Sequence, residues 1–365
     1  MKYYIIAGEA SGDLHASNLI KALYQYDPHA AVRGWGGEHM EQAGATVVKH
    51  FQELAFMGFW EVFTNLGTIF SNIRFCKEDI TTFQPDVIVF VDYPGFNLRI
   101  AKWAKLQGYR TAYYISPQVW AWKSSRTYAI KRDMDRMICI LPFETAFYQR
   151  YDYAVAYVGH PLLDAIQQLP PAVSFGDKVI ALLPGSRKQE ISSMLPTMIA
   201  VVSYFPDYKF IVAAAPSQPL SLYQNIIGDK KNITVIENQT YALLQTAIAA
   251  LVTSGTATLE TALFDVPQVV CYKGNSISYL IAKQLVKVKY ISLVNLIADK
   301  PLVKELIQNE FTIENCRMQL QHILQPDIAK AIKTNYAALR EQLGGGGASQ
   351  RAAHIIASLA VGDGL

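Results

Sequence analysis

Short apolar runs rich in β-branched and aromatic residues alternate along the chain with segments of helical periodicity. The runs predict strands and the intervening segments predict helices. In the first half the predicted strands are Tyr3–Ala7, Ala31–Gly34, Val87–Val91, Thr111–Ile115, Arg136–Leu141 and Ala154–Val158. The predicted helices there are Asp13–Tyr24, Ser71–Phe83, Asn97–Leu106 and Glu144–Tyr151. Such alternation is typical of a parallel sheet covered by helices.

The same alternation begins again after a segment that reads as a linker. Asp164–Asp177 combines a proline pair with small and polar residues, which suits an extended connection. The strands predicted beyond it are Lys178–Leu183, Lys209–Ala213, Ile233–Ile236, Ala249–Thr253 and Gln268–Cys271, with helices at Ser192–Tyr204, Tyr241–Ala247 and Leu259–Phe264. We therefore predict an α/β protein of two doubly wound domains.

We place the first domain at residues 1–165 and the second at residues 166–343. A glycine run at Gly344–Gly347 precedes the helix-like sequence QRAAHIIASLA, so residues 344–365 are predicted to form a tail. We expect its helix to pack on the first domain or on a partner subunit. Because doubly wound sheets bind ligands beyond the carboxyl ends of their strands, we expect a substrate cleft between the two domains.

Composition narrows the class of protein. The chain has 365 residues, of which 51% are hydrophobic and 17% charged, and its formal net charge of +3 argues against nucleic acid as the main partner. Its four cysteines are far apart and predict neither a disulfide framework nor a zinc site. The start of the sequence lacks a signal-peptide pattern, and no apolar run is long enough to span a bilayer. We expect a cytoplasmic protein that is able to lie on a membrane surface.

The sequence LVTSGTATLE predicts an anion site in the second domain. An apolar strand leads into a turn that opens a helix, so backbone N–H groups and the helix dipole face outward. Gly255 allows close approach of a phosphate, and Glu260 is placed to accept hydrogen bonds from a ribose diol. The hydroxyl donors of this turn are Ser254, Thr256 and Thr258. The alternative is an ordinary helix N-cap.

A second turn in that domain, LLPGSRKQEI, has the same strand-to-helix form. Arg187 projects from it, and a planar guanidinium can hold a diphosphate through two parallel hydrogen bonds. A surface pair between Arg187 and Glu190 is the alternative. Since two anion-favouring turns occur in one domain, we expect a nucleotide diphosphate. Neither turn matches GxxxxGK[ST] or GxGxxG, which disfavours kinase-like and dinucleotide sites.

The first domain offers two loops for the other substrate. GEASGD follows the first strand and contains Glu9, Ser11 and Gly12, and GWGGEHM supplies another glycine-rich turn. VDYPGFN ends a strand with Asp92, a carboxylate placed to remove a proton from a sugar hydroxyl. A helix cap is the ordinary alternative for Asp92. His15 and His160 are further candidates for the base, although a lone loop histidine is more often structural.

Two other features have competing interpretations. Asp133-Met134-Asp135 matches a DxD metal pattern, but we interpret it as a solvated turn and expect no catalytic metal.

The segment Leu54–Phe75 has more apolar residues than one helical face can hold, so an exposed patch for lipid chains competes with core burial. The patch residues are Phe56, Met57, Phe59, Trp60, Phe63 and Leu66.

Taken together, these motifs resemble the family of bacterial lipid-A-disaccharide synthases, which are inverting glycosyltransferases of the GT-B fold. The resemblance covers nearly the whole chain. Its motifs in order are GEASGD, GWGGEHM, FMGFWEV, VDYPGFN, YYISPQVWAW, LPFETAFY, VGHPLLD, LLPGSRKQEI, SGTATLE and YISLVNLI. The segment YISPQVWAW is the most distinctive of them and contributes Gln118 and Trp120 as acceptor-side candidates.

The resemblance implies transfer of a sugar from UDP-2,3-diacylglucosamine to the 6-hydroxyl of 2,3-diacylglucosamine 1-phosphate. The products would be a β-1,6-linked disaccharide and UDP, with no cofactor and no metal. It also implies that Asp92 is the base, that the second domain binds UDP, and that the apolar segment holds acyl chains at the cytoplasmic face of the inner membrane. A homodimer is implied for some members.

The sequence departs from the family's pattern at two positions. Gly95 stands where many relatives have a second acid, so that acid's role does not transfer, and His15 replaces a small residue. Other enzymes that share the fold, such as a UDP-N-acetylglucosamine epimerase or a transferase with a polar acceptor, remain an alternative. A non-catalytic module that binds nucleotide sugars at a membrane surface is another.

Overall fold

The computed structural model describes residues 1–54, 66–121, 124–167, 169, 173–230, 232–274 and 289–362. The chain forms two compact units. One comprises Met1–Gln168 together with Gly344–Leu365, and the other comprises Leu169–Leu343. Each unit is built on its own parallel sheet, so the prediction of a doubly wound α/β protein is confirmed.

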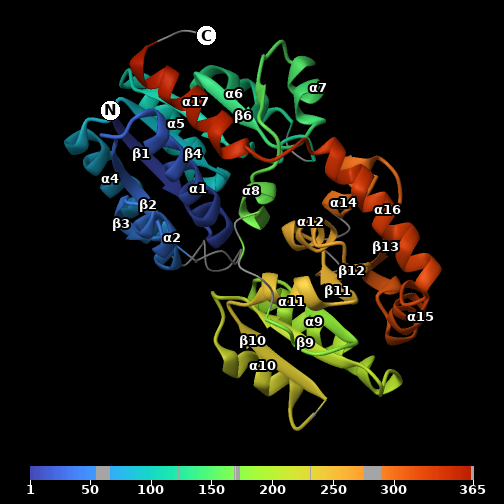
Figure 1. The fold of residues 1–365 in the computed structure, drawn as a ribbon. Coiled ribbons are helices and arrows are strands. Elements are labelled where there is room, and N and C mark those ends of the chain that lie inside the picture. The colour runs from blue at the N-terminus through green and yellow to red at the C-terminus, as the bar shows by residue number, and fades with distance from the viewer. Residues whose placement is uncertain are drawn as a thin grey trace. The chain divides into compact units, whose positions relative to one another are not determined.

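The first unit contains a seven-stranded parallel sheet in the order β3-β2-β1-β4-β5-β6-β7. Its strands are β1 (Lys2–Ala7), β2 (Ala31–Gly36), β3 (Thr46–His50), β4 (Val87–Val91), β5 (Arg110–Tyr114), β6 (Arg136–Cys139) and β7 (Ala156–Tyr157). All five residues of β4 are fully buried, because helices cover both faces of the sheet (Figure 1). This is why the central strands read as unbroken apolar runs.

Helices alternate with these strands. They are α1 (Ala10–Tyr26), α2 (Glu38–Gln42), α4 (Leu66–Phe83), α5 (Pro94–Leu106), α6 (Arg126–Asp133), α7 (Glu144–Gln149), α8 (Pro161–Gln167) and α17 (Ala348–Val361), with a short 3-10 helix, η1 (Phe51–Leu54). The last helix, α17, packs along α1 although more than 300 residues separate them in the sequence (Figure 1).

The second unit contains a six-stranded parallel sheet in the order β10-β9-β8-β11-β12-β13. Its strands are β8 (Val179–Leu183), β9 (Lys209–Ala214), β10 (Ile233–Glu237), β11 (Ala249–Thr253), β12 (Gln268–Tyr272) and β13 (Lys304–Ile307). Its helices are α9 (Lys188–Ala200), α10 (Leu220–Ile227), α11 (Thr240–Thr246), α12 (Thr256–Leu263), α14 (Leu293–Ala298), α15 (Ile313–Ile323) and α16 (Pro326–Gln342), with η2 (Val202–Tyr204) and η3 (Gln308–Glu310).

The predicted strands all occur, with ends that move by one or two residues. The edge strands β3 and β13 were not predicted, because their apolar residues are mixed with charged or polar ones, as in TVVKH and KELI. It also missed the helices α2, α6, α8 and α10 and the helices of residues 293–342. The first four have at most eight residues each and show no clear apolar period, and α15 and α16 expose mostly polar faces.

One carboxylate fastens the C-terminal helix to the first unit. Asp164, on α8, accepts hydrogen bonds from the backbone N–H groups of Gly347 (2.5 Å), Ala348 (3.3 Å) and Ser349 (2.7 Å). These N–H groups belong to the first turn of α17, where a helix lacks internal partners and favours negative charge. Arg351 adds a hydrogen bond from Nε to the Val158 carbonyl, 2.9 Å.

Replacing Asp164 by alanine is therefore expected to loosen α17. Three N–H groups, two of them on buried residues, would lose their acceptor, and the free energy of unfolding of this unit should fall by about 1–3 kcal/mol. Urea unfolding followed by circular dichroism, with limited proteolysis at the Gly344–Gly347 run, measures the effect. Glu78→Ala is the control, because that side chain lies on α4 of the same unit, is 61% exposed and pairs with Arg74 at the surface. Equal behaviour of the two variants would contradict the role of Asp164.

Candidate active site

The strand order of the first unit singles out the carboxyl ends of β1 and β4. The chain winds outward from these neighbouring strands in opposite directions, so the loops that follow them separate and leave a place for a ligand. The pairing of Ala7 with Val91 brings Gly8 and Asp92 next to each other. The two sequence motifs GEASGD and VDYPGFN therefore meet at one edge of the sheet.

Asp92 is a partly exposed carboxylate with a high pKa. Burial of the carboxyl group raises the pKa to about 7, the negative charge of Glu9 adds to this, and a hydrogen bond from the Tyr93 backbone opposes it. Near neutral pH the group consequently changes between a proton donor and a proton acceptor. This is the property that general acid–base chemistry requires at that pH.

Gly8 of the GEASGD motif leaves space for the ring of Tyr93, the residue that follows Asp92. The ring of Tyr93 lies directly over Gly8, where a Cβ atom would come within 2.3 Å of the ring carbons. Tyr93 also stacks on Phe96 with ring centroids 5.8 Å apart. The packing of Tyr93 thus explains why a side chain is excluded at position 8.

The acceptor-side candidates lie at the start of α1, which follows β1, and in the loop after β5. Glu9 immediately precedes α1 and is half-buried, Ser11 is half-buried, and Gly12 is buried in the first turn of that helix. In the loop after β5, Gln118 is exposed. Trp120 in that loop is half-buried and packs edge-on against Phe143, with centroids 4.9 Å apart. Of this set, Glu9 acts electrostatically on Asp92.

Asp13 is a residue of the GEASGD motif that the sequence analysis gave no role. It is buried, and its two carboxylate oxygens accept hydrogen bonds from the backbone N–H groups of Gly37 (2.7 Å), His39 (3.1 Å) and Met40 (3.2 Å). It therefore holds the glycine-rich turn GWGGEHM and the start of α2. The sequence held a signal for this contact. The turn GWGGEHM has no side-chain cap of its own for the helix that follows it, so the acid at the end of GEASGD was a natural acceptor for its N–H groups.

The second unit has the corresponding switch point between β8 and β11. Leu183 pairs with Val252 at the ends of these strands, so the turns that contain Arg187 and Ser254 are neighbours. Gly185 in the first turn has φ +109°, a conformation that side chains rarely adopt. The exposed Arg187 stands just before α9, and its Nη1 lies 3.6 Å from Glu190 Oε1. The structure thus places the two predicted anion turns together.

The hydroxyl groups around the start of α12 differ in their surroundings. Thr258 is buried and donates to the Gly255 carbonyl (2.8 Å), and Ser254 donates to the Ile291 carbonyl (2.8 Å). Both side chains therefore shape the turn, whereas Gly255 and Thr256 are exposed at the start of the helix. The N–H groups in the first turn of a helix lack partners further back in the helix, and here the Thr258 N–H bonds the Gly255 carbonyl at 3.2 Å.

Glu260 lies one turn further into α12. Burial raises its pKa to about 7, opposed by a hydrogen bond from Tyr241. The Tyr241 hydroxyl lies 3.4 Å from Glu260 Oε1. The residue as a whole is half-buried, and Tyr241 holds one of its carboxylate oxygens.

A polar cluster formed by the half-buried Glu305 and the buried Ser292 and Asn295 supports the Ser254 turn, a role that was not predicted. Glu305 Oε1 accepts hydrogen bonds from the Ser292 hydroxyl (2.7 Å) and the Asn295 side-chain amide (2.9 Å). The cluster fixes the segment that includes Ile291, whose carbonyl receives the Ser254 hydroxyl. Ser292 and Asn295 belong to the motif YISLVNLI, so buried polar residues within an apolar motif were the available signal.

The two histidine candidates lie side by side, with His160 buried and His15 half-buried. Their rings meet edge-on with centroids 6.4 Å apart. Burial lowers the pKa of His15 to about 4, partly offset by the charge of Asp164, and burial together with His15 lowers the pKa of His160 to about 3. His160 Nδ1 accepts from the Leu162 backbone. Such weakly basic rings favour a structural role.

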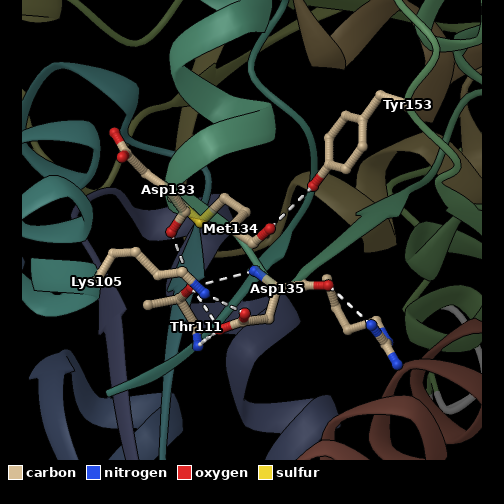
Figure 2. Close-up of polar contacts among 7 residues, drawn as sticks. Lys105, Thr111, Asp133, Met134, Asp135 and Tyr153 are labelled. Atoms are coloured by element: carbon tan, nitrogen blue, oxygen red, sulfur yellow. Dashed lines mark hydrogen bonds and ion pairs between the residues drawn. The ribbon is translucent and has the colours of Figure 1, made fainter. Parts of the chain in front are cut away.

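The prediction of a solvated turn at the DxD pattern is wrong. Asp133 ends α6, is buried and pairs with Arg132, whereas Asp135 accepts from both the backbone N–H (2.9 Å) and the hydroxyl (3.2 Å) of Thr111. Figure 2 shows Lys105 on the other oxygen of Asp135. The pattern ties α6 and β6 to the amino end of β5. Within the described parts of the chain, no three His, Cys, Asp or Glu side chains are grouped as metal ligands.

Most of the predicted acyl-chain patch, namely Phe56, Met57, Phe59, Trp60 and Phe63, lies outside the described residues, and Leu66 is described only as the first residue of α4. Further along α4, Phe70 is 68% exposed and Phe75 is 41% exposed. Among the helices that the structure describes, none is both long and apolar enough to cross a membrane.

Comparison with known sequences identifies relatives over nearly the whole chain. A family model described as lipid-A-disaccharide synthetase matches residues 3–359. A protein of Psychromonas ingrahamii named lipid-A-disaccharide synthase is 41% identical over 349 residues, which cover 90% of this chain and 91% of the relative. One of Geobacter metallireducens with the same name is 37% identical and covers 96% and 95% of the two chains.

Solved structures share the fold at low sequence identity. A putative UDP-N-acetylglucosamine 2-epimerase from Listeria monocytogenes has a TM-score of 0.67 at 13% identity, covering 98% of this chain and 96% of that chain. The glycotransferase of kitacinnamycin has a TM-score of 0.65 at 14% identity, covering 98% of both chains. These similarities bear on the fold alone, which is GT-B.

Proposed function

Because the chain belongs to the lipid-A-disaccharide synthetase family, it is a glycosyltransferase that forms the lipid A disaccharide, and we propose how its residues carry out that transfer. The donor is UDP-2,3-diacylglucosamine and the acceptor is 2,3-diacylglucosamine 1-phosphate. In the reaction the acceptor's 6-hydroxyl replaces UDP on the anomeric carbon of the donor, which yields the β-1,6-linked disaccharide. The hydroxyl must lose a proton, and the departing UDP gains negative charge.

Asp92 is the proposed base. The observation that supports this assignment is its position at the switch point of the first sheet, where a partly exposed carboxylate has a pKa near 7. A base of that strength, held in place beside the acceptor, accepts the proton of the 6-hydroxyl as its oxygen attacks. One displacement from the face opposite UDP inverts the anomeric carbon.

The turns before α9 and α12 are the proposed diphosphate site. The N–H groups at the start of α12, around Gly255 and Thr256, meet the phosphate oxygens, and Arg187 neutralises charge that develops as UDP leaves. Because these groups supply the positive charge, the proposed mechanism uses no metal ion. Ser254 and Thr258 hold the turn in this scheme through their hydrogen bonds to Ile291 and Gly255.

Glu260 is the proposed partner of the ribose. Its carboxylate is partly exposed one helical turn beyond the phosphate-binding end of α12, and two neighbouring ribose hydroxyls can donate to it. Tyr241 holds the other side of the carboxylate. This arrangement would favour UDP over a free diphosphate.

The acylated substrates call for an apolar surface. We propose that residues 54–75 hold acyl chains at the cytoplasmic face of the inner membrane, supported by the exposed Phe70 and Phe75 of α4. On the acceptor side, Glu9, Ser11, Gly12, Gln118 and Trp120 are the proposed contacts. A homodimer, as the resemblance implies for some members, is part of the same proposal. The family assignment favours this transfer over the epimerase reaction named for several structural neighbours.

Arg187→Ala is expected to weaken UDP binding by roughly 10- to 100-fold, because a charged donor to the diphosphate is lost. Isothermal titration with UDP measures this. Arg317→Ala is a matched control, since Arg317 is also paired with a glutamate three residues away, on α15. Unchanged affinity in the Arg187 variant would exclude its diphosphate role.

Asp92→Asn is expected to lower kcat by roughly 10²- to 10⁴-fold while leaving UDP affinity nearly intact. Since the pKa of Asp92 is raised to about 7, wild-type kcat should rise as the pH increases through 7 and the carboxyl group loses its proton. The variant should lack this rise, which separates Asp92 from Glu260, whose pKa is also about 7.

Release of UDP from both acylated sugars, followed across pH 5.5–8.5, provides the measurement. The control is Asp86→Asn, because Asp86 immediately precedes β4, at the end opposite Asp92, and accepts a hydrogen bond from Lys2. If the Asp92 variant turned over like the wild type, Asp92 would not be the base. Absence of UDP release in the wild type would instead indicate a module that only binds nucleotide sugars.

A further inference from the structure

The turn that contains Asp92 has an unusual backbone. Asp92 has φ 45° and Tyr93 has φ 51°, so two consecutive residues with side chains occupy the left-handed region. Ile115, which follows the neighbouring strand β5, has φ 66°. A β-branched residue rarely adopts such a value. Conformations of this kind cost free energy and persist only where surrounding groups impose them.

Two buried side chains hold the carbonyl group of Asp92. The Tyr113 hydroxyl donates to this oxygen at 2.5 Å, and Asn97 Nδ2 donates to it at 2.7 Å. Both residues are fully buried. The backbone N–H of Asp92 donates to the Tyr114 carbonyl at 3.2 Å. The peptide groups on both sides of the Asp92 side chain are therefore fixed by β5 and α5.

We propose that Tyr113 is a positioning residue for Asp92, and that it aims the carboxylate by holding the Asp92 carbonyl in the left-handed turn. Asn97 shares this task from α5. The proposal rests on the role of Asp92 as the base given above. Tyr113 does not touch the substrate in this scheme, and its effect reaches the reaction only through Asp92.

The bonding pattern distinguishes this role from ordinary core packing. A tyrosine that only fills the core would direct its hydroxyl to any available acceptor, whereas Tyr113 bonds the one residue whose side chain carries the proposed chemistry. Asn97 makes longer contacts with the carbonyls of Ile6 and Val91, both at 3.4 Å, so its shortest hydrogen bond is again to Asp92. Both side chains thus converge on one oxygen.

Tyr113→Phe tests the proposal because it removes the hydroxyl and keeps the ring. We expect kcat to fall by roughly tenfold or more, since a small displacement of a catalytic group has a large effect on rate. KM for both sugars and the affinity for UDP should stay within about twofold of the wild type. Thermal unfolding is measured beside them, so that a loss of rate caused by unfolding at the assay temperature is detected.

Tyr114→Phe is the matched control. Tyr114 is the next residue of β5 and is equally buried, but its hydroxyl makes no hydrogen bond to Asp92 among the described contacts. We expect its kcat to match the wild type. Equal losses of kcat in the two variants would show that removing any buried hydroxyl from this strand slows the enzyme, and would overturn the positioning role.

A double-mutant cycle with Asp92→Asn separates this proposal from the proposed base. If Tyr113 acts through Asp92, adding Tyr113→Phe to the Asp92 variant should change kcat by less than about twofold. If Asp92→Asn is slow and Tyr113→Phe alone resembles the wild type, Asp92 keeps its role and the positioning proposal fails. If Asp92→Asn itself is nearly as fast as the wild type, the proposed base fails first.

A second variant covers the case in which Tyr113→Phe does not fold. Asn97→Ser removes the other hydrogen bond to the Asp92 carbonyl and leaves Tyr113 in place. It should show the same fall in kcat with little change in KM, and the same lack of further loss in the Asp92→Asn background. Full activity of a folded Asn97→Ser protein, with Tyr113→Phe unable to fold, would reject the proposal.

Discussion

Burial of the two central parallel sheets on both faces is the constraint on which the rest of the structure depends. Strands such as β4 and β8 consist entirely of buried apolar residues. Polar chemistry is therefore confined to the ends of the strands, and in each sheet it collects where the winding direction reverses. Asp92 and the turn of Arg187 occupy such places in their own units. The positions of both candidate sites therefore follow from the burial of both faces of each sheet.

The same burial sets the acid strength of the site carboxylates. Asp92 and Glu260 both have a pKa raised to about 7, chiefly because their charged forms lose contact with water. Burial alone does not identify a site, however. Glu144 also has a pKa of about 7, yet it is buried and accepts hydrogen bonds from the backbone of Ile140 and Leu141. Partial exposure at a switch point distinguishes Asp92 and Glu260 from this structural acid.

The alternation of strand and helix could be predicted from the sequence because the central strands are unbroken apolar runs. The helices α2, α6, α8 and α10 and the edge strands β3 and β13 were not predicted, since these runs of four to eight residues mix polar and apolar types and show no clear period. At the DxD pattern the flanking charges suggested a solvated turn, but Thr111 and Lys105 draw Asp135 inward. Those partners lie more than 20 residues away in the sequence, and only the fold brings them together.

The motifs of the candidate site were also predictable only in part. A motif marks a turn that is chemically special without saying which of its residues face the ligand. In GEASGD, Asp13 is buried and caps α2, while Glu9 acts on Asp92. In SGTATLE, Thr258 supports the turn while Thr256 is exposed. Tyr113 is the first residue of the motif YYISPQVWAW and lies in the apolar strand β5, where nothing in the sequence indicates that its hydroxyl reaches Asp92. A positioning residue such as Tyr113 belongs to a buried apolar strand, so the sequence alone does not distinguish it from other core residues. Its long-range hydrogen bond to Asp92 identifies it in the structure.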